Sequence, residues 1–203
     1  MNRNYVITIG RQLGSGGKQI GETLSQGLSI PCYDKQLIQL ASRESGLGKD
    51  FFEKMDEKSS YSFFGNFVGF RSGYVGDCNY LCNETLFKIQ SDVIRQLAEK
   101  ESCIFVGRCA DYILRNYPHR LSVFISARKE DRIERIRLAE NISEKEAAAF
   151  IEQADKRRAA YYNYYSNKVW GMAASYDLCV NSSVFGLDRI ISMIEDWVRV
   201  NYE

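Results

Sequence analysis

The sequence has little excess of charge of either sign, and it has no long hydrophobic run. Its 203 residues include 27 Lys and Arg against 26 Asp and Glu, which gives a formal net charge of +1. Proteins that bind nucleic-acid polymers usually have a strong excess of basic residues, so this balance argues against such a partner. No run reaches the roughly 18 apolar residues of a membrane span, and the first expected strand begins at Tyr5, which leaves no room for a signal peptide. We therefore expect neither a membrane nor a nucleic-acid polymer as partner.

Histidine is also scarce, which bears on metal binding. The single histidine, His119, is remote from Cys78 and Cys82, the cysteine pair that could lie one helical turn apart. A zinc site is therefore not expected. Of the six cysteines, Cys32, Cys103 and Cys179 lie in apolar runs and are expected to be reduced core residues. This cysteine usage favours a cytoplasmic, reducing location.

Apolar runs alternate with helical patterns along most of the chain. Strands are expected at 5–9, 29–33, 103–106, 121–125 and 176–180. Helices are expected at 17–28, 35–43, 46–58, 83–100, 111–115, 129–140, 143–165 and 184–200. Strands that alternate with helices predict an α/β fold, a parallel sheet covered on both faces. A hydrophobic content of 45% and the absence of repeats or linkers fit one domain over residues 1–203.

A glycine-rich stretch near the N-terminus organises the rest of the chain. It lies between the apolar run 5–9 and the helical pattern 17–28, and it reads Gly14, Ser15, Gly16, Gly17, Lys18, Gln19. In such a layout backbone N–H groups curl around an anion, and glycines keep side chains away from it. The dipole of the following helix points at the same anion. A strand-to-helix turn without a ligand is the alternative, but the stretch is more typical of a phosphate-binding loop.

Two polar side chains of this loop bear on the phosphates and the metal. Lys18 lies just inside the helix, from where an ammonium group can reach the terminal phosphates of a nucleotide. Gln19 stands where a hydroxyl residue usually binds Mg²⁺, and it cannot replace a hydroxyl. Ser15 is the hydroxyl within the loop that could contribute to the metal.

The segment 61–76 combines aromatic residues and glycines without a helical or strand period. Its rings could pack on the core, cover a planar ligand as a flap, or pack on a second subunit. Packing is the commoner use of aromatic rings. An exposed aromatic patch here would favour a homodimer.

Cationic residues gather on two expected helices on either side of 141–143. The first helix and the residue before it carry Arg128, Lys129, Arg132, Arg135 and Arg137, and the second carries Lys156, Arg157 and Arg158. Such a pair predicts a lid over 128–160 that closes over phosphates and excludes water. The alternative is a solvated face with i,i+4 ion pairs.

Four further residues are candidates for a binding site, two of them at the carboxyl ends of strands. Arg108 follows the buried run 103–106 directly, which in an open parallel sheet lies beside the phosphate loop. Asp34 follows 29–33, where it could either cap the next helix or bind substrate. Asp155 and Arg158 share one helix face and could form an intrahelical pair, or bind opposite sides of a base and its phosphate.

These residues resemble the cytidylate kinase-like family. The resemblance rests on the loop 14–18, on 33–35, on the stretch 155–162 with its Asp-x-x-Arg pair, and on 176–182. It implies the fold of P-loop nucleoside monophosphate kinases, a three-layer, five-stranded parallel sheet of order 2-3-1-4-5 with a helical lid. It also implies transfer of the γ-phosphoryl group of ATP to CMP or dCMP with Mg²⁺, and 46–100 would be a variable acceptor-side insertion.

The resemblance assigns roles to single residues. The loop 14–18 would hold the ATP phosphates, and Arg108 would meet the phosphate of the acceptor. Catalytic roles are expected for Lys18, Arg108, Arg135 and Arg158. Acceptor binding is expected for Asp34, Lys35, Arg108, Arg132, Asp155, Arg157 and Arg158.

The chain departs from the family pattern at three positions, and each departure supports an alternative. Lys35 replaces a serine, and Ile151 replaces an arginine before the Asp-x-x-Arg aspartate. These two changes motivate a P-loop kinase with a non-nucleotide acceptor, such as a sugar or another hydroxyl metabolite. Gln19 in place of a hydroxyl residue motivates a catalytically silent nucleotide-binding or sensing module.

Overall fold

The computed structural model describes residues 4–35, 38, 41, 43, 46 and 79–202, with side chains in the last range given from residue 84 onward. Most of the expected helix 35–43, the expected helix 46–58 and the aromatic segment 61–76 lie outside the described residues. The same holds for much of the insertion expected at 46–100. In the described part, no helix is both long enough and apolar enough to cross a membrane.

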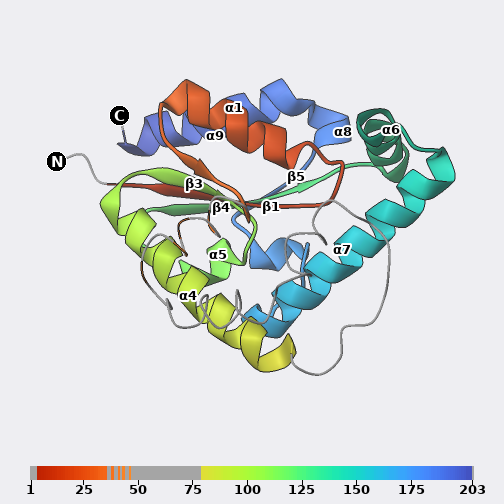
Figure 1. Cartoon of the computed structure of the whole chain (residues 1–203). Coiled ribbons are helices and arrows are strands. Elements are labelled where there is room, and N and C mark those ends of the chain that lie inside the picture. Colours follow the sequence, from red (N-terminus) through yellow and green to blue (C-terminus); the bar gives the residue numbers. More distant parts are fainter. Residues whose placement is uncertain are drawn as a thin grey trace.

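A five-stranded parallel sheet forms the centre of the molecule (Figure 1). Its order is β2-β3-β1-β4-β5, which confirms the predicted topology. The strands are β1 (Val6–Arg11), β2 (Cys32–Tyr33), β3 (Cys103–Val106), β4 (Arg120–Ser126) and β5 (Leu178–Asn181). The first four residues of β1 and all of β3 are buried, because helices cover both faces of the sheet.

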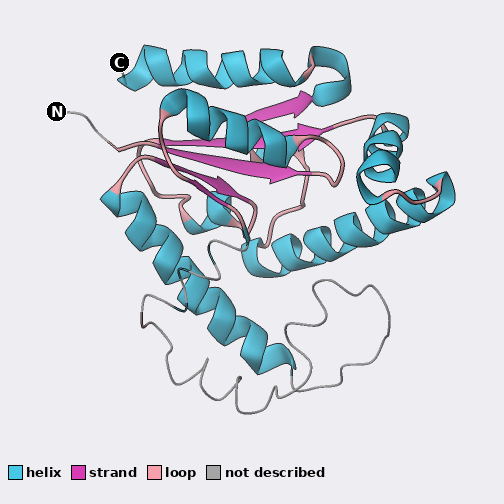
Figure 2. Ribbon diagram, turned by 45° about the horizontal axis from the view of Figure 1, so that its top comes forward, coloured by secondary structure: helices cyan, strands magenta, loops and turns pink. Residues whose placement is uncertain are grey.

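Helices form a layer on each face of the sheet (Figures 1 and 2). One layer holds α1 (Gly17–Leu28) and α9 (Leu187–Tyr202), which meet the sheet through an aliphatic core that includes Leu24 and Ile194. The other holds α4 (Asn79–Lys100), α5 (Ala110–Ile113) and α7 (Glu144–Ser166), and its core is richer in aromatic rings, such as Phe105 and Tyr162. The three layers predicted from the alternating pattern are therefore present.

Helices α6 (Lys129–Glu140) and α7 pack against each other at one end of the molecule (Figure 2). A small separate core of Ile136, Ala147 and Ile151 joins them, and Leu13 of the phosphate loop packs against it. Ser143 begins α7 with a capping box, in which its hydroxyl accepts from the Glu146 amide and the Glu146 carboxylate accepts from the Ser143 amide. The capping box predicted at this position is confirmed.

Some element boundaries differ from those expected. The fifth strand begins at Leu178, because Tyr176 turns its ring into the aromatic core. Cys179, expected in the core, is exposed, and Cys32, also expected there, is only partly buried, since β5 and β2 are the edge strands of the sheet. The last helix is broken at Gly186, with φ of 74°, into α8 (Ser182–Phe185) and α9.

Candidate functional site

The loop between β1 and α1 has the backbone of an anion site. Gly14 and Gly16 adopt left-handed conformations, with φ of 77° and 84°. Several backbone amides of the loop donate to no acceptor among the described residues. They are the amides of Gly14, Gly16, Gly17, Lys18 and Gln19. Unpaired amides in a glycine turn at a helix start bind anions such as phosphates. The predicted loop therefore offers donors without partners of their own.

Side chains are excluded from this loop by its close contacts. A Cβ atom on Gly14 would lie 2.8 Å from the Arg132 carbonyl oxygen. A Cβ atom on Gly17 would lie 2.6 Å from Cβ of Arg11. Residues with a Cβ at these two positions would therefore collide with the protein, so this path of the loop requires glycine there.

Two predicted lid arginines bind the carbonyl groups of the loop. Arg132 donates through Nε to the Leu13 carbonyl at 2.7 Å, and Arg135 donates to the Gly14 carbonyl at 2.9 Å. Asp155 completes the arrangement, since it pairs with the Arg132 guanidinium and accepts from the Leu13 amide at 2.9 Å. Arg132 is only 6% exposed. These contacts attach α6 and α7 to the loop.

Ser15, the predicted metal ligand, is fully buried within the loop. Its hydroxyl donates to the Gln12 carbonyl at 2.9 Å, and its own carbonyl accepts from the Ser182 hydroxyl at 2.7 Å. Gln19 is exposed on α1. The structure thus places the Ser15 hydroxyl in a bond that shapes the loop.

Lys18 faces two carboxylates. Its Nζ lies 3.3 Å from Asp34 at the end of β2 and 3.6 Å from Glu22 one helical turn along α1. The hydrogen bond to Asp34 is the main cause that raises the pKa of the Lys18 ammonium, and Glu22 adds to it. The Lys18 side chain is 60% exposed. The predicted phosphate ligand and the predicted acceptor ligand therefore form an ion pair at the mouth of the loop.

Arg108 lies at the end of β3, as the sequence predicted. Its backbone is left-handed, with φ of 58°, and it follows Gly107. Its guanidinium donates to Oε1 of Gln90 on α4 and lies 4.7 Å from the centre of the Tyr161 ring on α7. The group is thereby held in one orientation, and within the described residues its Nη1 has no hydrogen-bond acceptor.

Further cations, from α7 and from the chain just after β2, lie near Arg108. Arg158 donates to the Arg11 carbonyl at 3.1 Å, and burial lowers the pKa of the Arg158 guanidinium despite the nearby Asp155. Desolvation, and then repulsion from Arg108, Arg157 and Arg158, lowers the pKa of the Lys35 ammonium. The charges of Arg108, Arg157 and Arg158 thus all act on Lys35. Arg132 and Asp155, also expected to bind the acceptor, contact Leu13 of the loop instead.

One residue of this cluster was not predicted from the sequence. Arg11, the last residue of β1, lies among Arg158, Asp34 and Arg108. Burial is the first cause that lowers the pKa of the Arg11 guanidinium, and repulsion from Arg158 and Arg108 adds to it. A signal was present, because Gly10-Arg11 at the end of β1 repeats the Gly107-Arg108 pattern at the end of β3.

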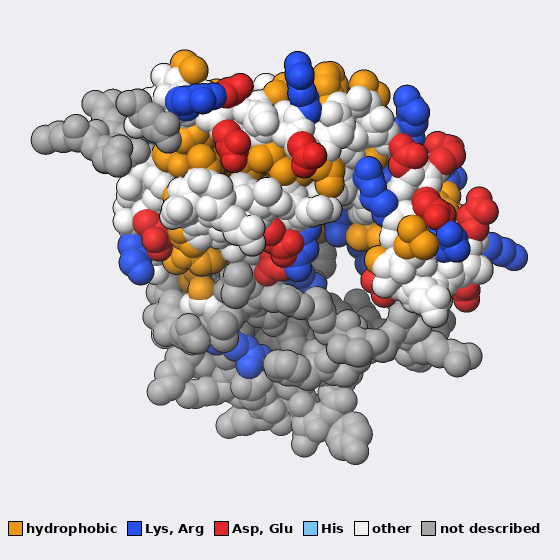
Figure 3. Space-filling view, turned by 90° about the horizontal axis from the view of Figure 1, so that it is seen from above, with side chains coloured by type: hydrophobic (Ala, Val, Ile, Leu, Met, Phe, Trp, Pro, Cys, Tyr) orange, Lys and Arg blue, Asp and Glu red, His pale blue; other side chains and the backbone are white. Residues whose placement is uncertain are grey.

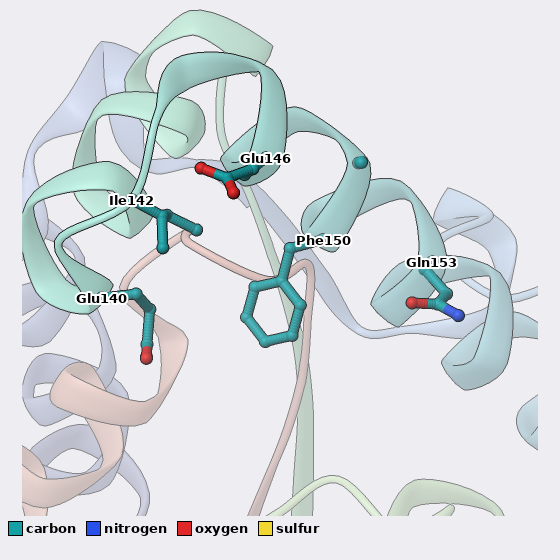
Figure 4. Close-up of a pocket in the computed structure, with 6 residues that line it drawn as sticks. Glu140, Ile142, Glu146, Phe150 and Gln153 are labelled. Atoms are coloured by element: carbon teal, nitrogen blue, oxygen red, sulfur yellow. The ribbon is translucent and has the colours of Figure 1, made fainter. Parts of the chain in front are cut away.

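The molecule has a hollow on its surface and a separate cavity. From above, the surface is hollowed between the layer of α1 and α9 and the α6–α7 end, and Lys and Arg atoms lie beside the hollow (Figure 3). A separate cavity of about 390 Å³ lies at the α6–α7 junction, with Ile142 and Phe150 projecting into it between Glu140 and Glu146 (Figure 4). The described residues contain no group of three or more His, Cys, Asp or Glu side chains placed to hold a metal ion.

Solved structures share this architecture over nearly the whole chain. A crystal structure of an uncharacterized protein from Eubacterium ventriosum is 28% identical, with a TM-score of 0.73 over 97% of this chain and 99% of that one. Shikimate kinase from Bacteroides thetaiotaomicron is 13% identical, with a TM-score of 0.52 over 96% and 98% of the two chains. TT1252 from Thermus thermophilus is 13% identical, with a TM-score of 0.55 over 98% and 99%. The last two likenesses concern the fold.

A comparison with curated protein sequences gave no match. The model of the cytidylate kinase-like family, however, matches residues 6–184. This range includes the glycine-rich loop, Arg108 and helices α6 and α7. With its P-loop kinase fold and this match over most of its length, the chain belongs to the cytidylate kinase-like family.

Proposed function

We propose that this chain transfers the γ-phosphoryl group of ATP to CMP, dCMP or a related small acceptor. One observation carries the proposal: unpaired amides of the loop and the guanidinium groups of Arg108 and Arg158 meet at the same edge of the sheet. Phosphoryl transfer depends on positioning and charge neutralisation more than on a protein base. The edge supplies both kinds of donor.

The donor side is formed by the loop and the start of α1. The amides of Gly14, Gly16 and Gly17 would hold the ATP phosphates, with the dipole of α1 aligned behind them. Lys18 would reach the terminal phosphates by exchanging its carboxylate partners for them. Arg135 would act from α6, where its contact with the Gly14 carbonyl keeps the lid beside the nucleotide.

The magnesium ion fits the described residues less well than the phosphates do. The Ser15 hydroxyl is engaged within the loop, and Asp34 is paired with Lys18. Asp34 is the carboxylate of the described site that would hold the ion once Lys18 releases it. When bound, Mg²⁺ supplies further neutralisation of the charge between the β- and γ-phosphates.

The acceptor side is strongly cationic, which favours an acceptor that carries a phosphate. Arg108, Arg158 and Lys35 raise the local positive charge, and Arg157 adds to it from α7. The pKa of the Arg158 guanidinium and that of the Lys35 ammonium are lowered, so a bound dianion would relieve repulsion within the protein. A neutral hydroxyl metabolite would leave this repulsion in place.

The proposal is tested by measuring ATP-dependent phosphorylation of each nucleoside monophosphate by the full chain. CMP or dCMP should be the best acceptor, and Arg108→Gln should lower kcat/KM roughly 100-fold, as expected for removal of one charged donor at the reacting phosphates. Arg115→Gln is the matched control, because Arg115 is exposed at the end of α5 and contacts only Tyr112 within the described residues. Absence of turnover with every monophosphate would remove the nucleotide-kinase proposal.

A second candidate is a nucleotide-binding module without transferase activity. The ion pair of Lys18 with Asp34 favours it, because this pair occupies two groups that the reaction needs. Such a module would bind ATP equally well with and without Mg²⁺ and would transfer nothing. Mg²⁺-dependent turnover in the same assay would exclude it.

A further inference from the structure

The Arg11 side chain runs through a space that exists because two glycines flank it. A Cβ on Gly17, at the start of α1, would lie only 2.6 Å from Cβ of Arg11. Its Nη1 lies where a Cβ on Gly107 would collide with it, at the end of β3. The side chain therefore passes from the phosphate loop to the base of Arg108, along the carboxyl edge of β1 and β3.

The Arg11 guanidinium has no direct partner in the described part of the chain, although the charge of Asp34 acts on it. The guanidinium has no hydrogen-bond acceptor and no carboxylate within ion-pair distance there. Lys18, in contrast, has both Asp34 and Glu22 within 4.0 Å. A partly buried guanidinium with like charges around it and unused donors is stabilised by an anion.

The position of Arg11 joins the two halves of the site. Its carbonyl accepts from Arg158, a residue of the acceptor cluster, and its side chain touches Gly17 of the phosphate loop. Arg108 and Asp34 act on the same guanidinium from the ends of β3 and β2. A phosphoryl group that moves from the loop to the acceptor cluster would pass this guanidinium.

We propose that the Arg11 guanidinium binds the phosphoryl group that passes from donor to acceptor, in addition to the donors that the loop pattern predicts. The inference rests on the proposed phosphotransferase function. A planar fork makes paired, charge-assisted hydrogen bonds to phosphate oxygens, which a lysine ammonium cannot match in geometry.

The charges and atoms of the step balance without a proton acceptor. An oxygen of the acceptor phosphate forms a bond to the γ-phosphorus, and the bond from that phosphorus to the β–γ bridging oxygen breaks. The leaving oxygen keeps the electron pair and remains on the donor diphosphate. Arg11 stays protonated throughout and neutralises the equatorial oxygens.

The test is a calorimetric titration of the full chain with β,γ-imido ATP and with ADP at one fixed Mg²⁺ concentration. Arg11→Gln should weaken binding of the triphosphate analogue roughly 30-fold and binding of ADP less than about 3-fold. Arg11→Lys should give an intermediate loss, and Lys18→Gln a smaller loss than Arg11→Gln. Arg199→Gln, an exposed arginine on α9, is the matched control and should bind like the original chain.

Several outcomes would overturn the assignment. Arg11→Gln could bind like Arg199→Gln, lose both nucleotides equally, or lose less than Lys18→Gln. If Arg11→Gln fails to fold, Arg11→Lys decides, and unchanged binding of the triphosphate analogue then contradicts the role. Selective loss in a chain that phosphorylates no acceptor would keep Arg11 as a phosphate ligand and remove the proposed enzyme. Failure of the original chain to bind the analogue would remove both.

Discussion

At the scale of single residues, the phosphate loop depends on glycines that have no room for a side chain. Gly14 has a φ of 77°, and a Cβ at this position would collide with backbone atoms of Arg132. We predict that Gly14→Ala lowers the free energy of unfolding by roughly 2 kcal/mol and weakens nucleotide binding, because both the backbone and the α6 contact are strained. Urea denaturation measures the first effect and calorimetry the second.

Gly27→Ala is the control for that substitution. Gly27 lies within α1, where a new Cβ would meet only the end of the Glu195 side chain, which can move. Alanine in a helix interior should be neutral or stabilise by about 0.5 to 1 kcal/mol. Equal losses in the two variants would contradict the account of the loop.

Asp155 is a second residue whose role can be separated from that of a surface charge. Asp155 pairs with Arg132 and accepts a hydrogen bond from the Leu13 amide. The Arg132 side chain is only 7% exposed. Asp155→Ala should cost roughly 3 kcal/mol of unfolding free energy in urea, because a buried guanidinium loses its partner. Asp196→Ala, which breaks an exposed pair with Arg199, should cost less than about 1 kcal/mol. If Asp155→Ala lost less than about 1 kcal/mol, the carboxylate would not be needed for stability, and acceptor binding would remain its role.

Asp111 makes the stability of the protein depend on pH in a predictable direction. Burial raises the pKa of this carboxyl above its ordinary 3.8, although the Tyr162 hydroxyl donates to it at 2.8 Å and opposes the rise. As the pH rises, the unfolded chain therefore loses this proton at a lower pH than the folded chain does. The free energy of unfolding consequently falls as the pH rises above about 4. We predict that Asp111→Asn gains stability relative to the original chain between pH 4 and pH 7, measured by urea denaturation.

Tyr162→Phe serves as the companion variant for this pH dependence. It removes a hydrogen bond that favours the charged carboxylate, so the penalty at pH 7 should grow. A stability difference between Asp111→Asn and the original chain that is flat across this pH range would be inconsistent with burial of the charge.

At the scale of elements, α7 contributes Asp155 and Arg158, and its start is fixed by the capping box of Ser143 and Glu146. Ser143→Ala should lower the unfolding free energy by about 1 kcal/mol and speed hydrogen exchange in the first turns of α7. Lys145→Ala, an exposed change in the same turn, should do neither. Equal exchange rates in the two variants would show that packing on α6 alone determines where the helix begins.

The sequence located most of these elements, but their ends depended on contacts that it does not reveal. Helix α1 begins at Gly17 and the strand 103–106 is matched residue for residue, since glycine punctuation and buried apolar runs are local signals. Tyr176 was expected in a strand, but its ring is drawn into a core assembled from distant segments. The break at Gly186 had a local signal, the glycine itself, which the expected helix 184–200 overlooked.

At the scale of the whole molecule, the strand order followed from the family resemblance, because alternating strands and helices predict a parallel sheet without specifying its order. The loop, Arg108 and Asp34 were predicted to meet because carboxyl ends of parallel strands share one edge. The carbonyl contacts of Arg132 and Arg135 could not be predicted, since they depend on how α6 packs on the loop. Arg11 was missed because it lay between the expected strand 5–9 and the expected loop 14–18, and β1 in fact extends to it.

Binding at this edge should stabilise the whole molecule, because the loop connects the sheet to α1, α6 and α7. At about 100 times its Kd, β,γ-imido ATP should add roughly 2.7 kcal/mol to the unfolding free energy and raise Tm by several degrees. Gly14→Ala should show a smaller rise at the same concentration. A Tm that does not respond to the analogue at any concentration would mean that the folded chain does not bind it.

The most direct measurement is a crystal structure of the full chain with β,γ-imido ATP. The account predicts that the β- and γ-phosphates accept hydrogen bonds from the amides of Gly16, Gly17 and Lys18, with the Arg11 guanidinium on the terminal phosphate. Phosphates bound at another surface of the molecule, with the loop amides still unpaired, would contradict it.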